Sequence, residues 1–280
     1  MSILISLTLL FAFVTVAGLS DDIISLRMSG RKIPNITMLF GNNLQILFHK
    51  YSLESLFVLS PLVLAAFSIP SQNEYLLPNN ICYNLFLLFL IFPFFGGYFA
   101  YMNSNQILSR KFNTAIFSYY INIFSLIILF IVLLQRISVN DMCGLIFVQQ
   151  GSINDWHIYK EPILASLTLM SLYSAGGFSP FTGFSRENFK YLFYKDKNSM
   201  LSSITFIYIY RYVLFVFFSD AYLGGAGNLY YMFLKIIFIN FIFSSISMLF
   251  PKINLKENLI YNVFILTILT VYTIIAGVFR

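Results

Sequence analysis

The chain has 280 residues, of which 59% are hydrophobic and only 10% are charged, and its mean hydropathy is +0.80. Soluble globular proteins carry roughly 25% charged residues, so this composition excludes a soluble monomer and predicts a membrane protein. The net charge of +6 is better explained by orientation across a bilayer than by nucleic-acid binding, because no polar domain carries a basic stripe.

Runs of apolar residues long enough to cross a bilayer, about 17 to 25 residues each, define the predicted helices. No Lys or Arg precedes Arg27, so we interpret the first run as a spanning helix and not as a signal peptide. The connectors are short, and we expect one all-α transmembrane domain over residues 1–280, a polytopic bundle of eight helices. The predicted helices are 3–19, 53–69, 83–101, 113–134, 162–178, 201–219, 229–250 and 258–279.

The distribution of Lys and Arg supports this count, because basic residues collect in loops on the cytoplasmic or matrix side of a membrane. Loops after the first, third, fifth and seventh helices hold twelve basic residues, whereas the opposite face holds three. Both termini are therefore expected on the non-cytoplasmic side. The twelve are Arg27, Arg31, Lys32, Lys50, Arg110, Lys111, Arg186, Lys190, Lys195, Lys197, Lys252 and Lys256, and the three are Arg136, Lys160 and Arg280.

Cysteine and histidine are too sparse for a conventional metal or haem site. The chain has only Cys82, Cys143, His49 and His157, and these are not clustered in sequence. We therefore expect no zinc, haem or iron–sulfur site, no cofactor bound by this chain, and contacts with phospholipids. The glycine-rich residues 223–227 are interpreted as a turn between helices, since no strand precedes them.

Ionisable residues inside the predicted helices are few, and helices 3–19, 83–101, 113–134 and 258–279 have none. Arg211 lies in the middle of helix 201–219, where an unpaired charge costs at least about 2.5 to 3.5 kcal/mol on insertion scales. It needs a carboxylate or a polar cavity. For Lys235 and Glu54 we favour snorkelling to the headgroups, because each lies nearer to the end of its helix.

Residues 176–188 (GGFSPFTGFSREN) predict a break in a transmembrane helix. Pro180 removes a backbone donor and disfavours helix at the preceding residue, so we expect the helix to stop or unwind between Gly176 and Gly183. Such breaks mark ion paths in transporters. The charged residues Arg186, Glu187 and Lys190 follow directly. An ordinary Pro/Gly loop with basic residues on the inner side is the alternative interpretation.

At these residues the sequence resembles the antiporter-like subunits 2, 4 and 5 of respiratory complex I, the proton-translocating NADH:ubiquinone oxidoreductase. Those proteins end a transmembrane helix in the motif Gly-x-Pro-Pro-Phe-x-Gly-Phe, followed by a short charged group. The resemblance covers roughly residues 160–218, and its order and spacing make it moderately specific. The matching residues are Gly177, Pro180, Phe181, Gly183 and Phe184, with Lys160 and Pro162 upstream and Thr205, Tyr208 and Arg211 downstream.

The sequence also departs from the family pattern. The stretch from Ser185 to Arg211 is several residues shorter than in the family. None of the first four predicted helices matches the Glu-containing and Lys-containing helices of the family, and these four contain no Lys or Arg. The upstream proton half-channel is therefore either absent or encoded in another polypeptide, as in a truncated or split form. The motif wording favours subunit 5, whereas the absence of a long lateral helix at the end favours subunit 2.

The resemblance implies a core membrane-arm subunit of complex I that contributes to proton translocation, with other membrane-arm subunits as partners. The Phe-rich and Tyr-rich composition suggests an AT-rich organellar genome, so we expect the mitochondrial inner membrane with both termini toward the intermembrane space. A non-pumping scaffold of the same arm is one alternative, and an independent transporter or an ATP synthase membrane subunit is another. The proton-translocation candidates are Arg186, Glu187, Lys190, Arg211 and Lys235, and the helix-break motif is Gly177, Pro180 and Gly183.

Arg211 separates pump from scaffold in this prediction. In a proton path it should meet a carboxylate or a hydrated cavity, with Glu187 the nearest candidate along the chain and Tyr208 a helical neighbour at i−3. In a scaffold it should instead be held by backbone carbonyls or by a partner subunit, since a buried charge must still be satisfied.

Overall fold

The fold was analysed in a computed structural model that describes residues 2–50, 106–139, 142–150, 152–176, 197–224, 229–249 and 255–278. All regular secondary structure in these ranges is helical. Five of the described helices are long and apolar enough to cross a membrane. The predicted fold class, an all-α polytopic membrane helix bundle, is therefore confirmed. Helices 53–69 and 83–101 lie outside the described residues, so the count of eight stays a prediction.

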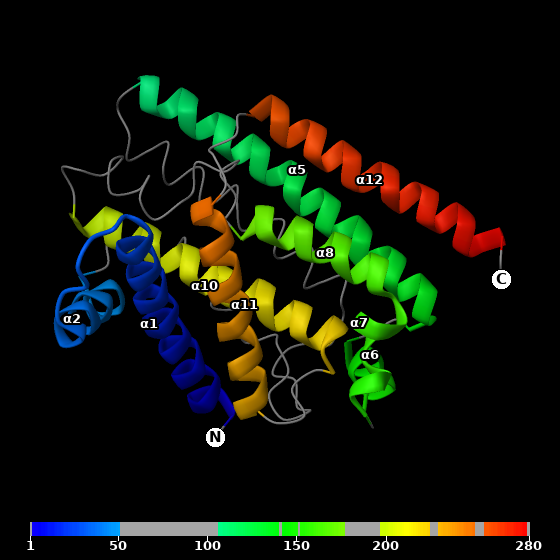
Figure 1. Ribbon diagram of the computed structural model, residues 1–280, viewed down its shortest axis with the longest axis horizontal. Helices are drawn as coiled ribbons and strands as arrows, with labels where there is room; N and C mark the ends of the chain where they lie inside the picture. The colour runs from blue at the N-terminus through cyan, green and yellow to red at the C-terminus, as the bar shows by residue number, and fades with distance from the viewer. Residues whose placement is uncertain are drawn as a thin grey trace.

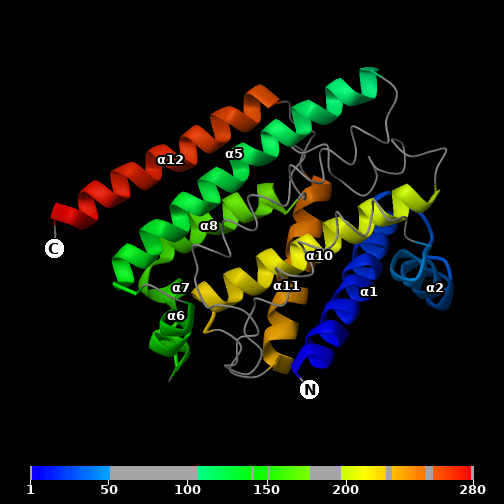
Figure 2. The ribbon, with the colours of Figure 1, turned by 180° about the vertical axis from the view of Figure 1, so that it is seen from behind.

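Helix α10 occupies the centre of the molecule. Every residue from 201 to 222 is buried, as expected for a helix that is apolar on all sides. It runs between α1, α2 and α11, and α11 crosses it steeply (Figures 1 and 2). The bounds of this group are α1 Ser2–Met28, α2 Ile36–Leu47, α10 Lys197–Tyr222 and α11 Leu229–Leu249.

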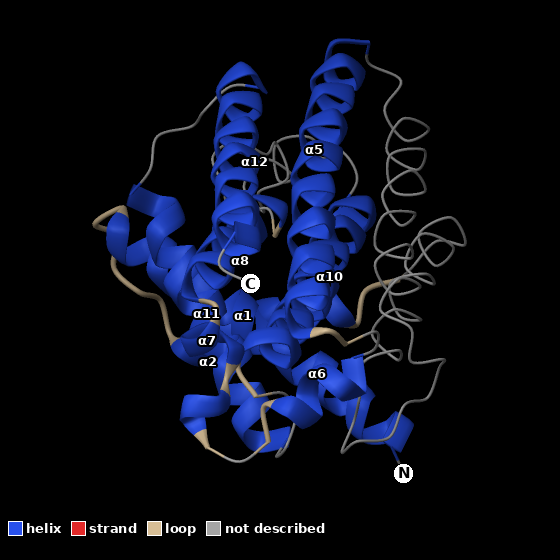
Figure 3. Cartoon of the chain, turned by 90° about the vertical axis from the view of Figure 1, so that its right-hand side faces the viewer, coloured by secondary structure: helices blue, strands red, loops and turns tan. Residues whose placement is uncertain are grey.

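A second group of helices lies beside the first. Helix α5 packs along both α8 and α12, and α12 also contacts α8; the near-parallel course of α5 and α12 is clear in Figure 3. Two short helices, α6 and α7, with the 3-10 turn η1 between them, follow α5, and both helices contact α10. The bounds are α5 Gln106–Ile137, α6 Met142–Val148, η1 Ile153–Asp155, α7 His157–Lys160, α8 Pro162–Ala175 and α12 Leu255–Val278.

Several helices extend beyond their predicted bounds. The first continues nine residues past position 19 to Met28, and α5 begins seven residues before position 113 and ends at Ile137. The prediction measured only the apolar run, whereas the backbone hydrogen bonds continue through the flanking polar residues. The expectation that helices 3–19, 113–134 and 258–279 carry no charge is therefore wrong for the helices as they form. They contain Asp21, Asp22 and Arg27 in α1, Arg110, Lys111 and Arg136 in α5, and Lys256 and Glu257 in α12.

Helix α8 is shorter than the predicted helix 162–178. It begins with Pro162 in its first turn, where a missing backbone N–H costs nothing, and ends at Ala175, with the Gly176 N–H bonded to the Leu172 carbonyl at 2.8 Å. Its 14 residues rise about 21 Å, less than the ~30 Å hydrocarbon core. Gly177, Pro180 and Gly183 lie outside the described residues, so the conformation of the break motif stays a prediction.

Helix α2 was not predicted, because its 12 residues are too few to span a membrane. The Asn35 side chain caps it by accepting a hydrogen bond from the Thr37 N–H at 3.2 Å, a common helix start. It packs against α1 where Gly18 faces Asn43, so closely that a Cβ at Gly18 would lie 2.3 Å from Asn43 Oδ1. A larger residue at position 18 would therefore force the Asn43 side chain to move.

Candidate functional site

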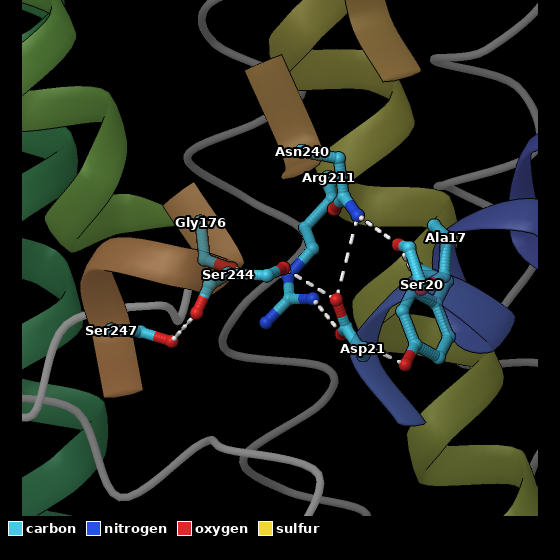
Figure 4. A network of polar contacts seen from close by, with 9 residues as sticks. Ala17, Ser20, Asp21, Gly176, Arg211, Asn240, Ser244 and Ser247 are labelled. Atoms are coloured by element: carbon cyan, nitrogen blue, oxygen red, sulfur yellow. Dashed lines mark hydrogen bonds and ion pairs between the residues drawn. The ribbon is translucent and has the colours of Figure 1, made fainter. Parts of the chain in front are cut away.

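The centre of the molecule contains an ion pair between a buried arginine and a partly buried aspartate. Arg211 is 4% exposed, and its Nη1 donates to Asp21 Oδ2 at 2.8 Å. The two residues come from α10 and α1, 190 positions apart in the chain (Figure 4). The sequence predicted that Arg211 needs a partner, with Glu187 as the nearest candidate along the chain. Glu187 lies outside the described residues. The carboxylate that the structure shows beside Arg211 is that of Asp21.

Asp21 is surrounded by hydrogen-bond donors. Its Oδ2 also accepts from the Tyr208 hydroxyl at 3.0 Å. Its Oδ1 accepts a short hydrogen bond from Ser244 Oγ and a longer one from Asn240 Nδ2 at 3.4 Å. The carboxyl group is thus bonded to one cation and three further donors, and charge-assisted hydrogen bonds of this kind are among the strongest in proteins. The environment thus offsets the cost of removing this charge from water.

Arg211 also binds the end of a helix. Its Nε donates to the Gly176 carbonyl at 2.8 Å, directly after the last residue of α8. The final carbonyls of a helix lack partners within the helix and carry partial negative charge, so a guanidinium is well matched to them. The guanidinium carbon also lies 5.4 Å from the centre of the Tyr208 ring. One cation therefore connects α1 and α10 with the start of the predicted break.

Helical spacing explains why these side chains meet. Tyr208 and Arg211 are three residues apart on α10, and Asn240 and Ser244 are four apart on α11, so each pair shares a face. Asn240 Nδ2 also donates to Ser20 Oγ at 3.1 Å, which anchors α11 to the turn of α1 that holds Asp21. The site is thus built by α1, α10 and α11 with the end of α8, and Figure 4 shows the labelled side chains converging.

Lys235 lies in a different place, at the far end of α10. Its Nζ donates to the Leu223 carbonyl and lies 4.5 Å from the centre of the Trp156 ring. The side chain is half-buried and lies against protein at the end of α10, and its snorkelling to the headgroups stays a prediction. Asp220, which sequence analysis did not single out, is buried nearby at this end of α10.

A further ion pair ties the second helix group together. Arg136 Nη2 lies 3.2 Å from Glu161 Oε1, and the Tyr272 hydroxyl donates a short hydrogen bond to Glu161 Oε2. These residues come from the end of α5, the residue before α8, and α12. Lys160, which was matched to the family motif, instead pairs with Asp155 at 3.4 Å on the exposed surface.

Amide and hydroxyl side chains connect α5, α8 and α12 inside the second group. Asn262 Nδ2 donates to Asn122 Oδ1 at 2.7 Å, and Ser125 Oγ donates to Asn262 Oδ1 at 2.8 Å. Ser171 Oγ donates to the Asn122 carbonyl at 3.2 Å. All of these residues are buried. Such bonds hold helices together where the hydrophobic effect does not favour association, as inside a bilayer.

The other predicted site residues lie outside the described part of the chain, namely Arg186, Glu187 and Lys190 with Gly177, Pro180 and Gly183. Among the described residues no group of three or more His, Cys, Asp and Glu side chains is close enough to hold a metal ion. The member of the central network that the sequence did not reveal is Asp21. The sequence pattern that could have revealed it is the acidic pair Asp21 and Asp22, which lies within one helical turn of the end of the predicted helix 3–19. That helix in fact continues to Met28.

Comparison with known proteins gives a relationship in fold. No protein-family model matches the sequence, and no curated protein matches it. Among solved structures, the chain is similar to a chain of the membrane-bound sulfane sulfur reductase, an archaeal respiratory membrane complex. The two share 15% sequence identity with a TM-score of 0.70, and the match covers 93% of each chain. The helical arrangement over nearly the full length is therefore that of a subunit found in a respiratory membrane complex.

Proposed function

We propose that this chain is an antiporter-like membrane-arm subunit of a proton-pumping NADH:ubiquinone oxidoreductase, contributing to proton translocation while quinone is reduced elsewhere in the complex. The observation that carries the proposal is the Arg211–Asp21 pair, buried in the bundle and bound to the end of α8. Ionisable residues inside a membrane are costly and are usually functional. The shared fold with a respiratory membrane complex subunit supports the same reading.

The pair offers a way to couple a movement to a proton. While Arg211 touches Asp21, the guanidinium stabilises the carboxylate. If the two groups separate, the carboxylate loses that stabilisation in a medium of low dielectric, and taking up a proton becomes favourable. Arg211 holds both Asp21 and the Gly176 carbonyl, so a shift of the α8 end changes the position of the charge. In this mechanism Asp21 binds the proton and Arg211 controls it.

The test compares Arg211→Gln and Asp21→Asn in the assembled complex, with protons pumped per electron as the measurement. We expect both to lower this ratio while electron transfer from NADH continues. Arg211→Lys keeps the charge but loses the planar fork that reaches Asp21 and Gly176 together, so an intermediate ratio is expected. Arg27→Gln, on the same helix as Asp21 but exposed, is the matched control and should pump normally.

A structural scaffold in the same membrane arm is the second candidate. It is favoured by the bond from Arg211 Nε to a backbone carbonyl and by the number of helices that the network joins. Removing one partner of a buried pair typically costs about 3 to 5 kcal/mol whatever its role, so assembly must be measured first. Normal pumping by an assembled Asp21→Asn complex would support the scaffold and contradict the proton path.

The remaining alternatives differ in the proteins with which the chain assembles. We propose other membrane-arm subunits and phospholipids as its contacts, and the mitochondrial inner membrane as its location. Native electrophoresis with mass spectrometry of purified membranes tests this. Co-migration with NADH dehydrogenase activity is expected, whereas migration alone or with an ATP synthase would support an independent transporter or an ATP synthase subunit.

A further inference from the structure

A second carboxyl group is enclosed at the C-terminal end of α10. Asp220 is 0% exposed. Neither Oδ1 nor Oδ2 has a hydrogen-bond partner among the described residues, and none of the ion pairs in that part of the chain includes it. An ionised carboxylate without donors is very costly to bury, and the protonated acid costs far less, so burial favours the protonated form. The surroundings of Asp220 thus differ sharply from those of Asp21, which has a cation and three further donors.

The backbone around Asp220 is already satisfied by Gln149. Gln149 Nε2 donates to the Asp220 carbonyl at 2.9 Å and to the Ala221 carbonyl at 3.2 Å. Its Oε1 accepts from the Gly224 N–H at 3.0 Å and from the His157 N–H at 3.2 Å. These bonds fix the end of α10, but none of them reaches the carboxyl group of Asp220.

The charged and titratable groups around this end come from three helices. Lys235 on α11 is close enough for its charge to act on Asp220, and Tyr212 on α10, a neutral phenol, is close enough to feel a charge on Asp220. Helix α7, which packs against α10, carries His157 and Lys160. Burial, assisted by the charge of Lys160, lowers the pKa of His157 to about 4, so His157 is neutral at physiological pH. Lys235 is then the nearby cation whose position decides the state of Asp220.

Lys235 now lies against other groups. Its ammonium donates to the Leu223 carbonyl and faces the Trp156 ring, and it forms no direct ion pair with Asp220. Leu223 is three residues beyond Asp220 on the same turn of chain. The lysine ammonium sits on a flexible four-carbon stem, and its charge already acts on Asp220 from this position.

We propose that Asp220 is a second proton-binding site inside the bundle and that Lys235 controls its release. While the ammonium stays on the Leu223 carbonyl and the Trp156 ring, Asp220 keeps its proton. When the ammonium turns to the carboxyl group, the O–H bond breaks, the proton leaves to water beyond the end of α10, and an Asp220–Lys235 ion pair remains. The site lies nine residues from Arg211, or about 13 Å along the helix. It does not require that the chain pumps.

Infrared spectroscopy of membranes holding the native assembly tests the bound proton. Wild type should show the C=O band of a protonated carboxylic acid at neutral pH, shifted by deuterium exchange and absent in Asp220→Asn. Asp155→Asn, which removes an exposed carboxylate paired with Lys160, should retain the band. An unchanged band in Asp220→Asn would overturn the proposal. If that variant does not accumulate, Asp220→Glu should move the band, and an unmoved band would overturn it equally.

Two lysine variants test the control by Lys235. In Lys235→Met the cation that stabilises the ionised acid is gone, so the Asp220 band should survive further into alkaline pH than in wild type. Lys235→Arg keeps the charge and should restore the wild-type titration. Identical titrations in wild type and Lys235→Met would exclude Lys235 from the site. These measurements report proton occupancy, whereas the proposed function is judged by protons per electron, so either proposal can fail without the other.

Discussion

At the scale of single residues, the sequence predicted that Arg211 requires a partner but did not identify that partner. Arg211 was predicted to require a partner because it lies in the middle of an apolar run, and it has one. The partner was missed because Asp21 lies 190 positions away, and because no local pattern relates the two. The sequence predicted either a carboxylate partner, as in a proton path, or a backbone carbonyl partner, as in a scaffold. In the structure Arg211 binds both. Side chains with several donors satisfy more than one acceptor.

His157 gives a prediction about acid sensitivity. Both its ring nitrogens are buried without a hydrogen-bond partner in the described part of the chain, and burial lowers its pKa from 6.5 to about 4. The unfolded chain therefore binds a proton at a higher pH than the folded protein. Stability from this residue is complete above pH 6.5 and is lost as pH falls toward 4, on the order of 3 kcal/mol in all.

Thermal unfolding of the protein in lipid at several pH values measures this effect. His157→Leu removes the titrating group and two unpaired nitrogens, so its stability should vary less between pH 6.5 and 4. A pH dependence as steep in His157→Leu as in wild type would assign the acid sensitivity to other groups.

At the scale of elements, the apolar helices were predictable and their ends were not. Helix 229–250 was placed within one residue of α11 at each end, because polar residues stop the apolar run where the helix stops. The first helix was ended nine residues early, because Ser20, Asp21 and Asp22 resemble the start of a loop. In the folded chain these polar side chains find partners on other helices, which lets the helix continue through them. Tertiary contacts of this kind cannot be read from one segment.

The end of α10 depends on one amide side chain. Gln149→Leu would leave the carbonyls of Asp220 and Ala221 and the N–H groups of His157 and Gly224 without this partner. An unsatisfied buried group costs about 1 to 3 kcal/mol, so we expect a loss of at least about 2 kcal/mol in stability. Hydrogen exchange at the Gly224 amide should also become faster.

The neighbouring residue supplies the control for this prediction. Gln150 is exposed, and Gln150→Leu should change stability by no more than about 0.5 kcal/mol. Equal losses in the two variants would show that the effect comes from the added apolar side chain and not from the hydrogen bonds of Gln149.

The contact between α1 and α2 makes a separate prediction. In Gly18→Ala the new Cβ would lie 2.3 Å from Asn43 Oδ1, so the Asn43 side chain must move. That movement breaks its hydrogen bonds to Asp22 Oδ2 at 3.0 Å and to the Leu39 carbonyl at 2.9 Å. We expect a loss of about 1 to 2 kcal/mol in thermal unfolding.

Gly41→Ala is the matched substitution on α2, because nothing lies within 4 Å of its Cβ position. Since alanine is the better helix former, this variant should gain up to about 1 kcal/mol. If Gly41→Ala lost as much stability as Gly18→Ala, the loss would not come from the contact between the new Cβ and Asn43.

At the scale of the whole molecule, composition alone predicted a bundle of membrane helices, and the topology can now be tested at two exposed serines. Ser29 follows α1 and Ser152 follows α6, and both are exposed. The distribution of basic residues puts Ser29, beside Arg27 and Arg31, on the inner side and Ser152 on the other.

With Cys82 and Cys143 replaced by serine, an impermeant thiol reagent added from outside should label Ser152→Cys but not Ser29→Cys. Labelling of both from one side would contradict an odd number of spans between them and would require one of helices 53–69, 83–101 and α5 to be reassigned. The test is decisive for the architecture because a single missing span would invert the side of every later loop, including the predicted loop that contains Lys252.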